Sequence, residues 1–219
     1  MDNRYCAVLF DLDGTLTDSK EGILNSVAYA LEYLGRPLPE HETLMKFLGP
    51  PLLDSFQRYC GCGPEEAADG VRKYRERYAV TGLFENRPYE GIEDVLKLLK
   101  IQGRTVALAT SKPQAFAEQI LDHFGLMLYF DIVEGSGFHG EKATKQQVIE
   151  AVLDKLPGYA SDQVLMVGDR LHDVKGAAGA GIQCLGVAYG YGGRRELEGA
   201  GAAWVVDTMD DLKDFFALP

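Results

Sequence analysis

The stretch Phe10-Asp11-Leu12-Asp13-Gly14-Thr15-Leu16-Thr17-Asp18-Ser19 decides the fold class of this chain. It follows the apolar run Ala7-Val8-Leu9-Phe10, which is typical of a buried strand, and Gly14 then interrupts the strand pattern. Because side chains at positions i and i+2 of a strand point the same way, Asp11 and Asp13 are expected to face one site. Two acids separated by one residue can also cap backbone amides in a loop, so this pair alone leaves both interpretations open.

The complete string D-L-D-G-T-L-T-D-S resembles the first motif of the haloacid dehalogenase superfamily. The resemblance implies that Asp11 is a nucleophile that attacks phosphorus. It implies that Asp13 protonates the leaving oxygen and later takes a proton from water. It also implies Mg2+ as cofactor, which suits a site of one or two carboxylates with water and a substrate phosphate. Gly14 and Thr15 are expected among the substrate-binding residues.

The composition of the 219 residues is ordinary for a globular protein, with 46% hydrophobic and 25% charged residues. The formal net charge of -11 argues against a partner such as nucleic acid or an anionic membrane, because those need a positive field. The N-terminus lacks a signal-peptide pattern, and no apolar run approaches the ~18 residues of a membrane span. The cytoplasm is therefore the expected compartment. The oligomeric state is not readable from the sequence.

The four cysteines, Cys6, Cys60, Cys62 and Cys184, are expected to be free thiols. Only Cys60 and Cys62 are close enough in sequence to suggest a motif. A single C-x-C without a second pair is a weak zinc signal.

Apolar runs that alternate with amphipathic segments predict an α/β fold with a doubly wound, Rossmann-like parallel sheet covered on both faces. The expected strands cover residues 5–10, 105–109, 130–133, 164–167, 184–187 and 204–206. Between Leu16 and about Phe84 lie nearly seventy residues, far too many for a loop in a compact domain. Their helical periodicity predicts an inserted all-helical domain. The predicted domains are a core of residues 1–15 and 85–219 and a helical insert of residues 16–84.

Thr110-Ser111-Lys112-Pro113 follows one expected strand and precedes a helix, where hydroxyls and free amides suit a phosphoryl group. An ordinary Ser/Thr helix cap is the alternative on local grounds. The segment resembles the second motif of the superfamily, which implies a catalytic role for Thr110 and substrate binding by Ser111 and Lys112.

The basic motif has two candidates, Lys142 and Lys145, because the Pro-x-Pro pattern of many relatives is absent. Thr144 with Gln147 predicts a capping box that puts Lys145 at the first helical position. Its side chain then shares a face with apolar residues that must pack on the sheet, so it is directed toward the interior. We therefore favour Lys145 over Lys142 as the catalytic lysine, with Asp11 and the phosphoryl group as its expected partners.

Val167-Gly168-Asp169-Arg170-Leu171-His172-Asp173 follows another expected strand and resembles the G-D-x-x-x-D form of the fourth motif. The resemblance implies that Asp169 binds Mg2+ beside the Asp11 carboxylate and the Asp13 main-chain carbonyl. Asp173 is expected to act indirectly, by orienting metal-bound waters or by holding Lys145. His172 is not expected to be a ligand, because hard Mg2+ prefers oxygen.

The resemblance implies a Mg2+-dependent phosphatase of the phosphoglycolate phosphatase-like branch, with a helical cap and an aspartyl-phosphate intermediate. Its substrate would be a small phosphorylated metabolite. The alternatives within the branch are a 5'-nucleotidase, a pyrophosphatase and a β-phosphoglucomutase-like phosphomutase. A non-enzymatic phospho-receiver is a further alternative, against which Asp13 and the helical insert argue. The rigid loop at Gly49 and Pro50 is the expected cap contribution to substrate binding.

Overall fold

The computed structural model describes residues 5–138, 141–156 and 158–217. The chain divides into two compact units. The core unit comprises Met1–Asp18 and Pro88–Pro219, and the helical unit is Ser19–Arg87. The short strands β2 (Thr17–Asp18) and β3 (Arg87–Pro88) mark the two crossings of the chain between the units.

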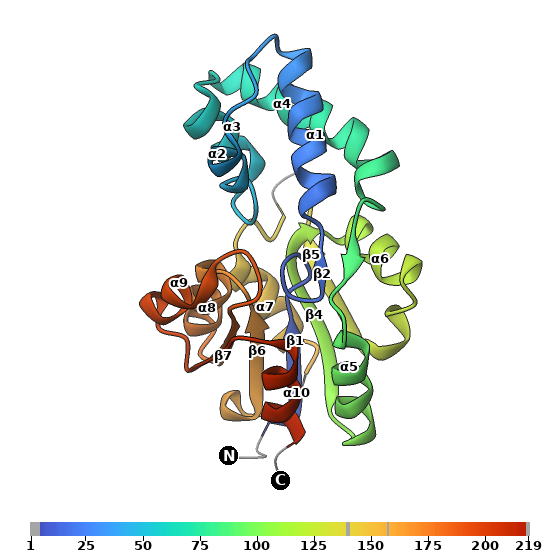
Figure 1. Cartoon of the computed structure of the whole chain (residues 1–219). Coiled ribbons are helices and arrows are strands. Elements are labelled where there is room, and N and C mark those ends of the chain that lie inside the picture. The colour runs from blue at the N-terminus through green and yellow to red at the C-terminus, as the bar shows by residue number, and fades with distance from the viewer. Residues whose placement is uncertain (1–4, 139–140, 157, 218–219) are drawn as a thin grey trace. The chain divides into compact units, whose positions relative to one another are not determined.

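The core unit contains a six-stranded sheet in the order β5-β4-β1-β6-β7-β8, and every neighbouring pair is parallel (Figure 1). The strands are β1 (Ala7–Phe10), β4 (Thr105–Pro113), β5 (Ile132–Ser136), β6 (Val164–Gly168), β7 (Gln183–Val187) and β8 (Trp204–Val206). Phe10 pairs in register with Leu108 on one side and Val167 on the other. The carboxyl ends of these three strands therefore meet at one edge of the sheet, where open α/β sheets bind ligands.

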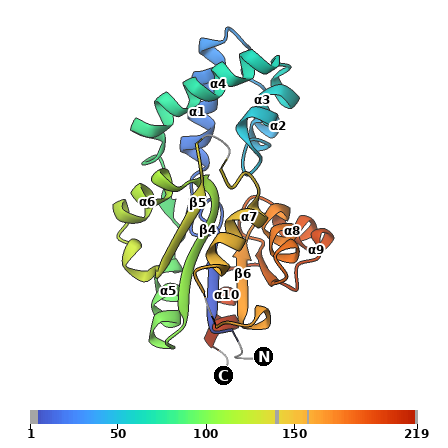
Figure 2. The same ribbon diagram turned by 180° about the vertical axis from the view of Figure 1, so that it is seen from behind.

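Helices cover both faces of this sheet (Figures 1 and 2). They are α5 (Ile92–Ile101), α6 (Gln114–His123), α7 (Lys145–Leu153), α8 (Leu171–Gly179), α9 (Gly193–Ala200) and α10 (Met209–Ala217), with short 3-10 turns at Met127–Tyr129 and Ser161–Gln163. On one face, α7, α8 and α9 pack on alternate strand residues such as Leu9, Ala107 and Met166. Figure 2 shows α7 on the near side of the sheet with α8 beside it, and α10 lies on the opposite face in Figure 1.

The helical unit consists of α1 (Lys20–Tyr33), α2 (His41–Met45), α3 (Leu52–Cys60), α4 (Pro64–Arg77) and a π-helical turn at Tyr78–Gly82. Its core includes Phe47 and Phe56, whose rings meet edge to face with centroids 5.3 Å apart. The bidentate ion pair between Arg36 and Glu66 joins the segment after α1 to α4. Cys60 and Cys62 are free thiols, as are Cys6 and Cys184.

The predicted fold class is confirmed: a doubly wound parallel sheet carries an inserted all-helical unit. Five of the six expected strands differ from the observed ones at one end or both. The largest differences are that β4 continues to Pro113 and that β5 covers Ile132–Ser136. Among the helices of the described residues, none combines the length and the apolar character that a bilayer crossing requires.

Candidate active site

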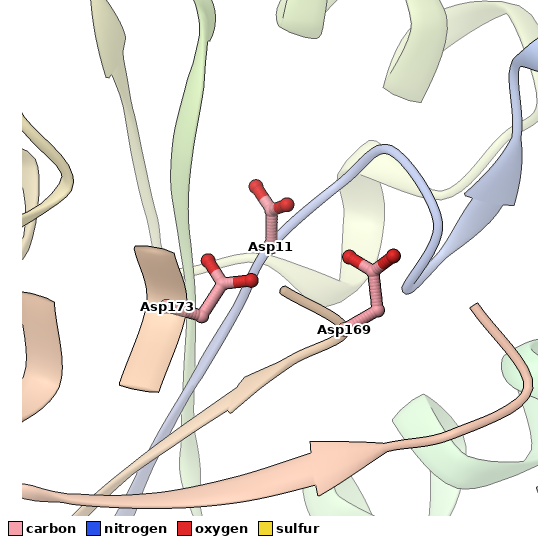
Figure 3. Close-up of side chains that lie close together, drawn as sticks. All are labelled: Asp11, Asp169 and Asp173. Carbon is pink, nitrogen blue, oxygen red and sulfur yellow. The ribbon is translucent and has the colours of Figure 1, made fainter. Parts of the chain in front are cut away.

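Three buried carboxylates gather at the carboxyl edge of the core sheet (Figure 3). Asp11 directly follows β1 and Asp169 directly follows β6, the neighbouring strand. Asp173 lies in the first turn of α8, the helix that leaves this edge. One carboxylate oxygen from each residue lies within 4.8 Å of the other two. Strand pairing thus brings together acids that are more than 150 positions apart in the chain.

The lysine that starts α7 lies against this cluster. Lys145 Nζ is 2.7 Å from Asp11 Oδ1 and 2.8 Å from Asp173 Oδ1, and it also donates to the main-chain oxygen of Ala109 at 2.9 Å. The side chain is buried. Its place follows from the capping box of Thr144 and Gln147, which is present as predicted and sets the first turn of α7. The expected ion pair with Asp11 is therefore part of the structure.

Electrostatics within the cluster favour added positive charge. Burial raises the pKa of Asp169 well above its usual range, the Asp173 and Asp11 carboxylates add to this, and the Tyr191 N–H opposes it. Burial also raises the pKa of Asp173, although the Lys145 ammonium acts in the other direction. Burial alone would lower the pKa of Lys145, but the attraction of Asp11 and Asp173 outweighs it, so the pKa is raised. Lys145 thus remains a cation between two acids.

The donor set fits a divalent cation that prefers oxygen. In the described part of the chain, three carboxylates face one contacting lysine, which leaves two negative charges without compensation when all three acids are ionised. Buried unbalanced charge is costly unless an ion pairs with it. Asp11 and Asp169 offer carboxylate oxygens of the kind that Mg2+ takes in proteins. Asp173 is less available, because Lys145 contacts Oδ1 and the Arg170 N–H donates to Oδ2 at 3.0 Å.

Asp13 faces a second lysine. Lys112 Nζ lies 2.9 Å from Asp13 Oδ2, and the lysine side chain is almost completely buried. Asp13 Oδ1 is buried as well and accepts no hydrogen bond from the described residues. Lys112, expected to bind substrate, thus contacts the expected acid and base of the site.

Thr110 and Ser111 lie at the same edge, in the last part of β4. The segment was expected to follow a strand that ends at Ala109, but β4 runs on to Pro113 with a shift in register between Thr110 and Pro113. Thr110 is buried, and its Oγ1 accepts a hydrogen bond from the Lys112 N–H at 3.2 Å. The main-chain oxygen of Ser111 accepts a hydrogen bond from Ser136. Helix α6 begins only at Gln114.

Gly14 and Thr15 lie against Asp169. Gly14 has a φ of +83° and approaches so closely that a Cβ would stand 2.2 Å from Asp169 Oδ2. Thr15 is buried, with its Oγ1 3.4 Å from Asp169 Oδ1. Both residues thus border the candidate metal ligand. Gly49 and Pro50 belong to the helical unit, between α2 and α3, and their role in substrate binding stays a prediction.

The other candidate lysine has a different partner. Lys142 makes a close ion pair with Glu134, a buried acid of β5 that Lys155 also contacts. In the structure Lys142 therefore neutralises Glu134, and Lys145 contacts Asp11.

The loop between β7 and α9 also contributes to the site, although none of its residues was predicted from the sequence. The Tyr191 N–H donates to Asp169 Oδ2 at 2.7 Å, and the Tyr189 hydroxyl donates to the main-chain oxygen of Thr15 at 3.0 Å. A signal was present in the run Gly190-Tyr191-Gly192-Gly193, which follows a strand whose carboxyl end lies at the same edge.

Several known proteins are similar to this chain over most of its length. The sequence model of the haloacid dehalogenase-like hydrolases matches residues 8–187. A 5'-nucleotidase of Pseudomonas aeruginosa is 45% identical over 194 residues, which are 89% of this chain and 87% of the relative. The tyrosine-protein kinase PtkA of Mycobacterium tuberculosis is 37% identical over 209 residues, covering 94% and 71%. A phosphoglycolate phosphatase of Pseudomonas savastanoi is 32% identical over 212 residues, covering 94% and 77%.

A solved structure shares the whole fold. The crystal structure of a predicted phosphatase from Clostridium acetobutylicum matches with a TM-score of 0.91 at 43% identity, over 97% of this chain and 98% of the other.

Proposed function

Because the chain belongs to the haloacid dehalogenase-like hydrolases, we propose that it is a Mg2+-dependent phosphatase that cleaves a small phosphorylated metabolite through an aspartyl-phosphate. The observation that carries the proposal is the contact of Lys145 with both Asp11 and Asp173 beside Asp169. It combines a nucleophile, a fixed cation and an excess of negative charge suited to a metal ion. The helical unit is proposed as the cap.

In the first half-reaction, an oxygen of Asp11 forms a bond to phosphorus and the bond from phosphorus to the leaving oxygen breaks. Asp13 gives its proton to the leaving oxygen. Lys145 balances the negative charge of Asp11 and of the phosphoryl oxygens, and Thr110 with Ser111 binds those oxygens. Lys112 holds the carboxyl group of Asp13 at 2.9 Å.

In the second half-reaction, Asp13 takes a proton from water as the water oxygen forms a bond to the phosphorus of the aspartyl-phosphate. The bond from phosphorus to the Asp11 oxygen breaks, which releases inorganic phosphate and restores the Asp11 carboxylate. Asp11, Asp169 and the main-chain carbonyl of Asp13 would hold the Mg2+. An ion bound there would compensate the negative charge that accumulates on the phosphoryl oxygens.

A nucleoside 5'-monophosphate is the first substrate to test, since the relative named 5'-nucleotidase is more similar to this chain than the one named phosphoglycolate phosphatase. Phosphoglycolate and pyrophosphate follow. A phosphomutase with the same nucleophile would return the phosphoryl group to a second hydroxyl. Sustained release of inorganic phosphate distinguishes hydrolysis from such transfer. The cytoplasm is the proposed compartment, which the four free thiols support.

The proposal is tested with purified protein and Mg2+ on a panel of nucleotides, sugar phosphates, phosphoglycolate and pyrophosphate. The wild type should release phosphate and, when quenched during turnover, carry one phosphoryl group on Asp11 by peptide mass spectrometry. Asp11→Asn should lose both. Asp122→Asn, at an exposed position of α6, serves as the matched control. Retained turnover in Asp11→Asn would falsify the assignment of the nucleophile.

A further inference from the structure

One residue outside the four motifs contacts both a candidate metal ligand and the last residue of β2. Tyr191 donates its main-chain N–H to Asp169 Oδ2 at 2.7 Å. Its hydroxyl donates to Asp18 Oδ1 at 3.2 Å. Both contacts lie within the core unit. Tyr191 thus links the end of β6 to the segment that follows the nucleophile.

A neighbouring tyrosine of the same loop makes a parallel link. The Tyr189 hydroxyl donates to the main-chain oxygen of Thr15 at 3.0 Å, and its ring packs edge to face on Tyr89 with centroids 5.0 Å apart. The loop of residues 188–192, here named the tyrosine loop, is therefore attached at two points, Thr15 and Asp18, to the segment between β1 and the end of β2. Such attachment restricts the positions available to the Tyr191 N–H.

Glycines enclose Asp169 from both segments. An added Cβ would stand 2.2 Å from Asp169 Oδ2 at Gly14 and 2.3 Å from Asp169 Cβ at Gly190. At Gly192 it would stand 2.4 Å from the main-chain oxygen of Asp169. Real Cβ atoms do not approach other atoms so closely, so only glycine lets the backbone surround this acid. The close approach leaves the Asp169 carboxylate little freedom to rotate.

We propose that Tyr191 is a positioning residue for the divalent cation. Its hydroxyl bond to Asp18 holds the tyrosine loop so that its N–H fixes one oxygen of Asp169 and leaves the carboxylate oriented toward Asp11. The inference rests on the proposed function, because it takes Asp169 to be a metal ligand. Partners that orient a metal ligand are worth about 10- to 100-fold in metal affinity when removed. Tyr191→Phe keeps the N–H and removes the hydroxyl that donates to Asp18.

The first test measures cation binding rather than activity. Mg2+ and Mn2+ are titrated calorimetrically into the metal-free wild type, Tyr191→Phe and Tyr159→Phe. Tyr159 is a matched control because its hydroxyl bonds Thr105 Oγ1 at the start of β4, the opposite edge of the sheet. Tyr191→Phe should raise the dissociation constant about three- to tenfold, in line with the net contribution of one ordinary hydrogen bond, because the N–H that contacts Asp169 stays in place. Tyr159→Phe should bind like the wild type. Equal affinity in all three proteins overturns the proposal.

A second set of variants separates positioning from general loosening of the fold. Asp18→Asn keeps an oxygen that accepts the tyrosine hydroxyl and should retain most of the affinity, whereas Asp18→Ala should weaken binding as Tyr191→Phe does. The double variant Asp18→Ala/Tyr191→Phe should be no weaker than either single variant, because both remove the same bond. Fully additive losses would show that the two residues act independently and would contradict the proposal.

The two hypotheses fail in different ways. A wild type that binds neither cation contradicts the proposed metal dependence itself. A wild type that binds Mg2+ while Tyr191→Phe binds it equally well contradicts only the role of Tyr191. The thermal midpoint of each metal-free variant, measured in the same buffer, shows that a loss of affinity does not come from unfolding.

Discussion

Lys112 Nζ lies 2.9 Å from Asp13 Oδ2, whereas the other oxygen of that carboxyl group is buried and accepts no hydrogen bond within the described residues. One oxygen of the proposed acid and base is thus held by Lys112, and the other has no hydrogen-bond partner among the described residues. An oxygen without a protein partner keeps its lone pairs free to exchange a proton with a leaving group or a water molecule. This arrangement predicts how the site responds to the chemistry of the leaving group.

Asp13→Asn should reduce turnover strongly for an alkyl phosphate and much less for p-nitrophenyl phosphate. A poor leaving group needs a proton from Asp13, a contribution of about 10²- to 10⁴-fold, whereas p-nitrophenolate leaves without one. Lys112→Ala should likewise reduce turnover more for the alkyl phosphate than for p-nitrophenyl phosphate, with a smaller loss. The carboxyl group of Asp13 is still present in this variant but loses the contact that orients it. Single-turnover rates of phosphorylation on the two substrates measure this. Equal losses on both would contradict the acid role.

Lys145→Ala should lower kcat/KM by several orders of magnitude, since it removes the cation that faces both Asp11 and Asp173. It should also destabilise the metal-free protein, by about 3–5 kcal/mol if those acids stay ionised. Lys142→Ala should be milder, because Lys142 pairs with Glu134 instead. Steady-state kinetics and urea unfolding of both variants provide the measurement. The reverse ranking would mean that Lys142 delivers the catalytic charge.

Chelation should abolish turnover, and added Mg2+ should restore it. Asp169→Ala should weaken Mg2+ binding more than Asp173→Ala, because both oxygens of Asp173 already have protein partners, Lys145 and the Arg170 N–H. Titration calorimetry on the two metal-free variants ranks them. Full activity after exhaustive removal of metal would rule out the proposed cofactor, and a larger loss in Asp173→Ala would exchange the roles of the two acids.

The metal-free protein should lose stability as the pH rises, owing to Asp169. Burial and the neighbouring carboxylates raise the pKa of Asp169 well above its usual range. Between its ordinary pKa and the raised one, the folded protein holds a proton that the unfolded chain has released, so unfolding becomes easier with increasing pH. The urea concentration at the unfolding midpoint, measured with a chelator present, should therefore decrease from about pH 5 to pH 8. This decrease should be smaller in Asp169→Asn than in the wild type.

Mg2+ affinity should change with pH in the opposite sense. A cation must displace the proton that Asp169 retains, so binding should tighten as the pH rises and should release protons. Calorimetry in buffers of different ionisation enthalpy counts those protons. Binding that is independent of pH and releases no proton would mean that Asp169 is already ionised in the metal-free protein.

Substitution of the loop at Gly49 and Pro50 should change the ranking of substrates without changing the metal requirement. The chemistry is assigned to the core unit, whereas this loop lies between α2 and α3 of the helical unit. Gly49 has a φ of +104°, so replacements at Pro50 that keep Gly49 preserve the backbone best. Relative kcat/KM values across the phosphate panel provide the test. An unchanged ranking after replacement of the whole loop would place specificity elsewhere.

Local sequence together with the family resemblance predicted the fold class and several residues that lie together at the carboxyl edge of the sheet. Each acid of the cluster directly follows a strand or lies in the first turn of the helix after it. Parallel strands bring these positions to one edge of the sheet, whatever the length of the chain between them. The position of Lys145 was predictable for a similar reason, because a capping box sets the first helical residue and periodicity sets its face.

Contacts between distant side chains required the tertiary structure. The pairing of Lys112 with Asp13 depends on the continuation of β4 to Pro113, which no local pattern indicated. The contact of Tyr191 with Asp169 depends on close backbone approach at glycines from two segments. Periodicity in a sequence reports which face of its own element a residue occupies. Which distant residue fills the space opposite that face is decided by packing of the whole core, and this no single segment encodes.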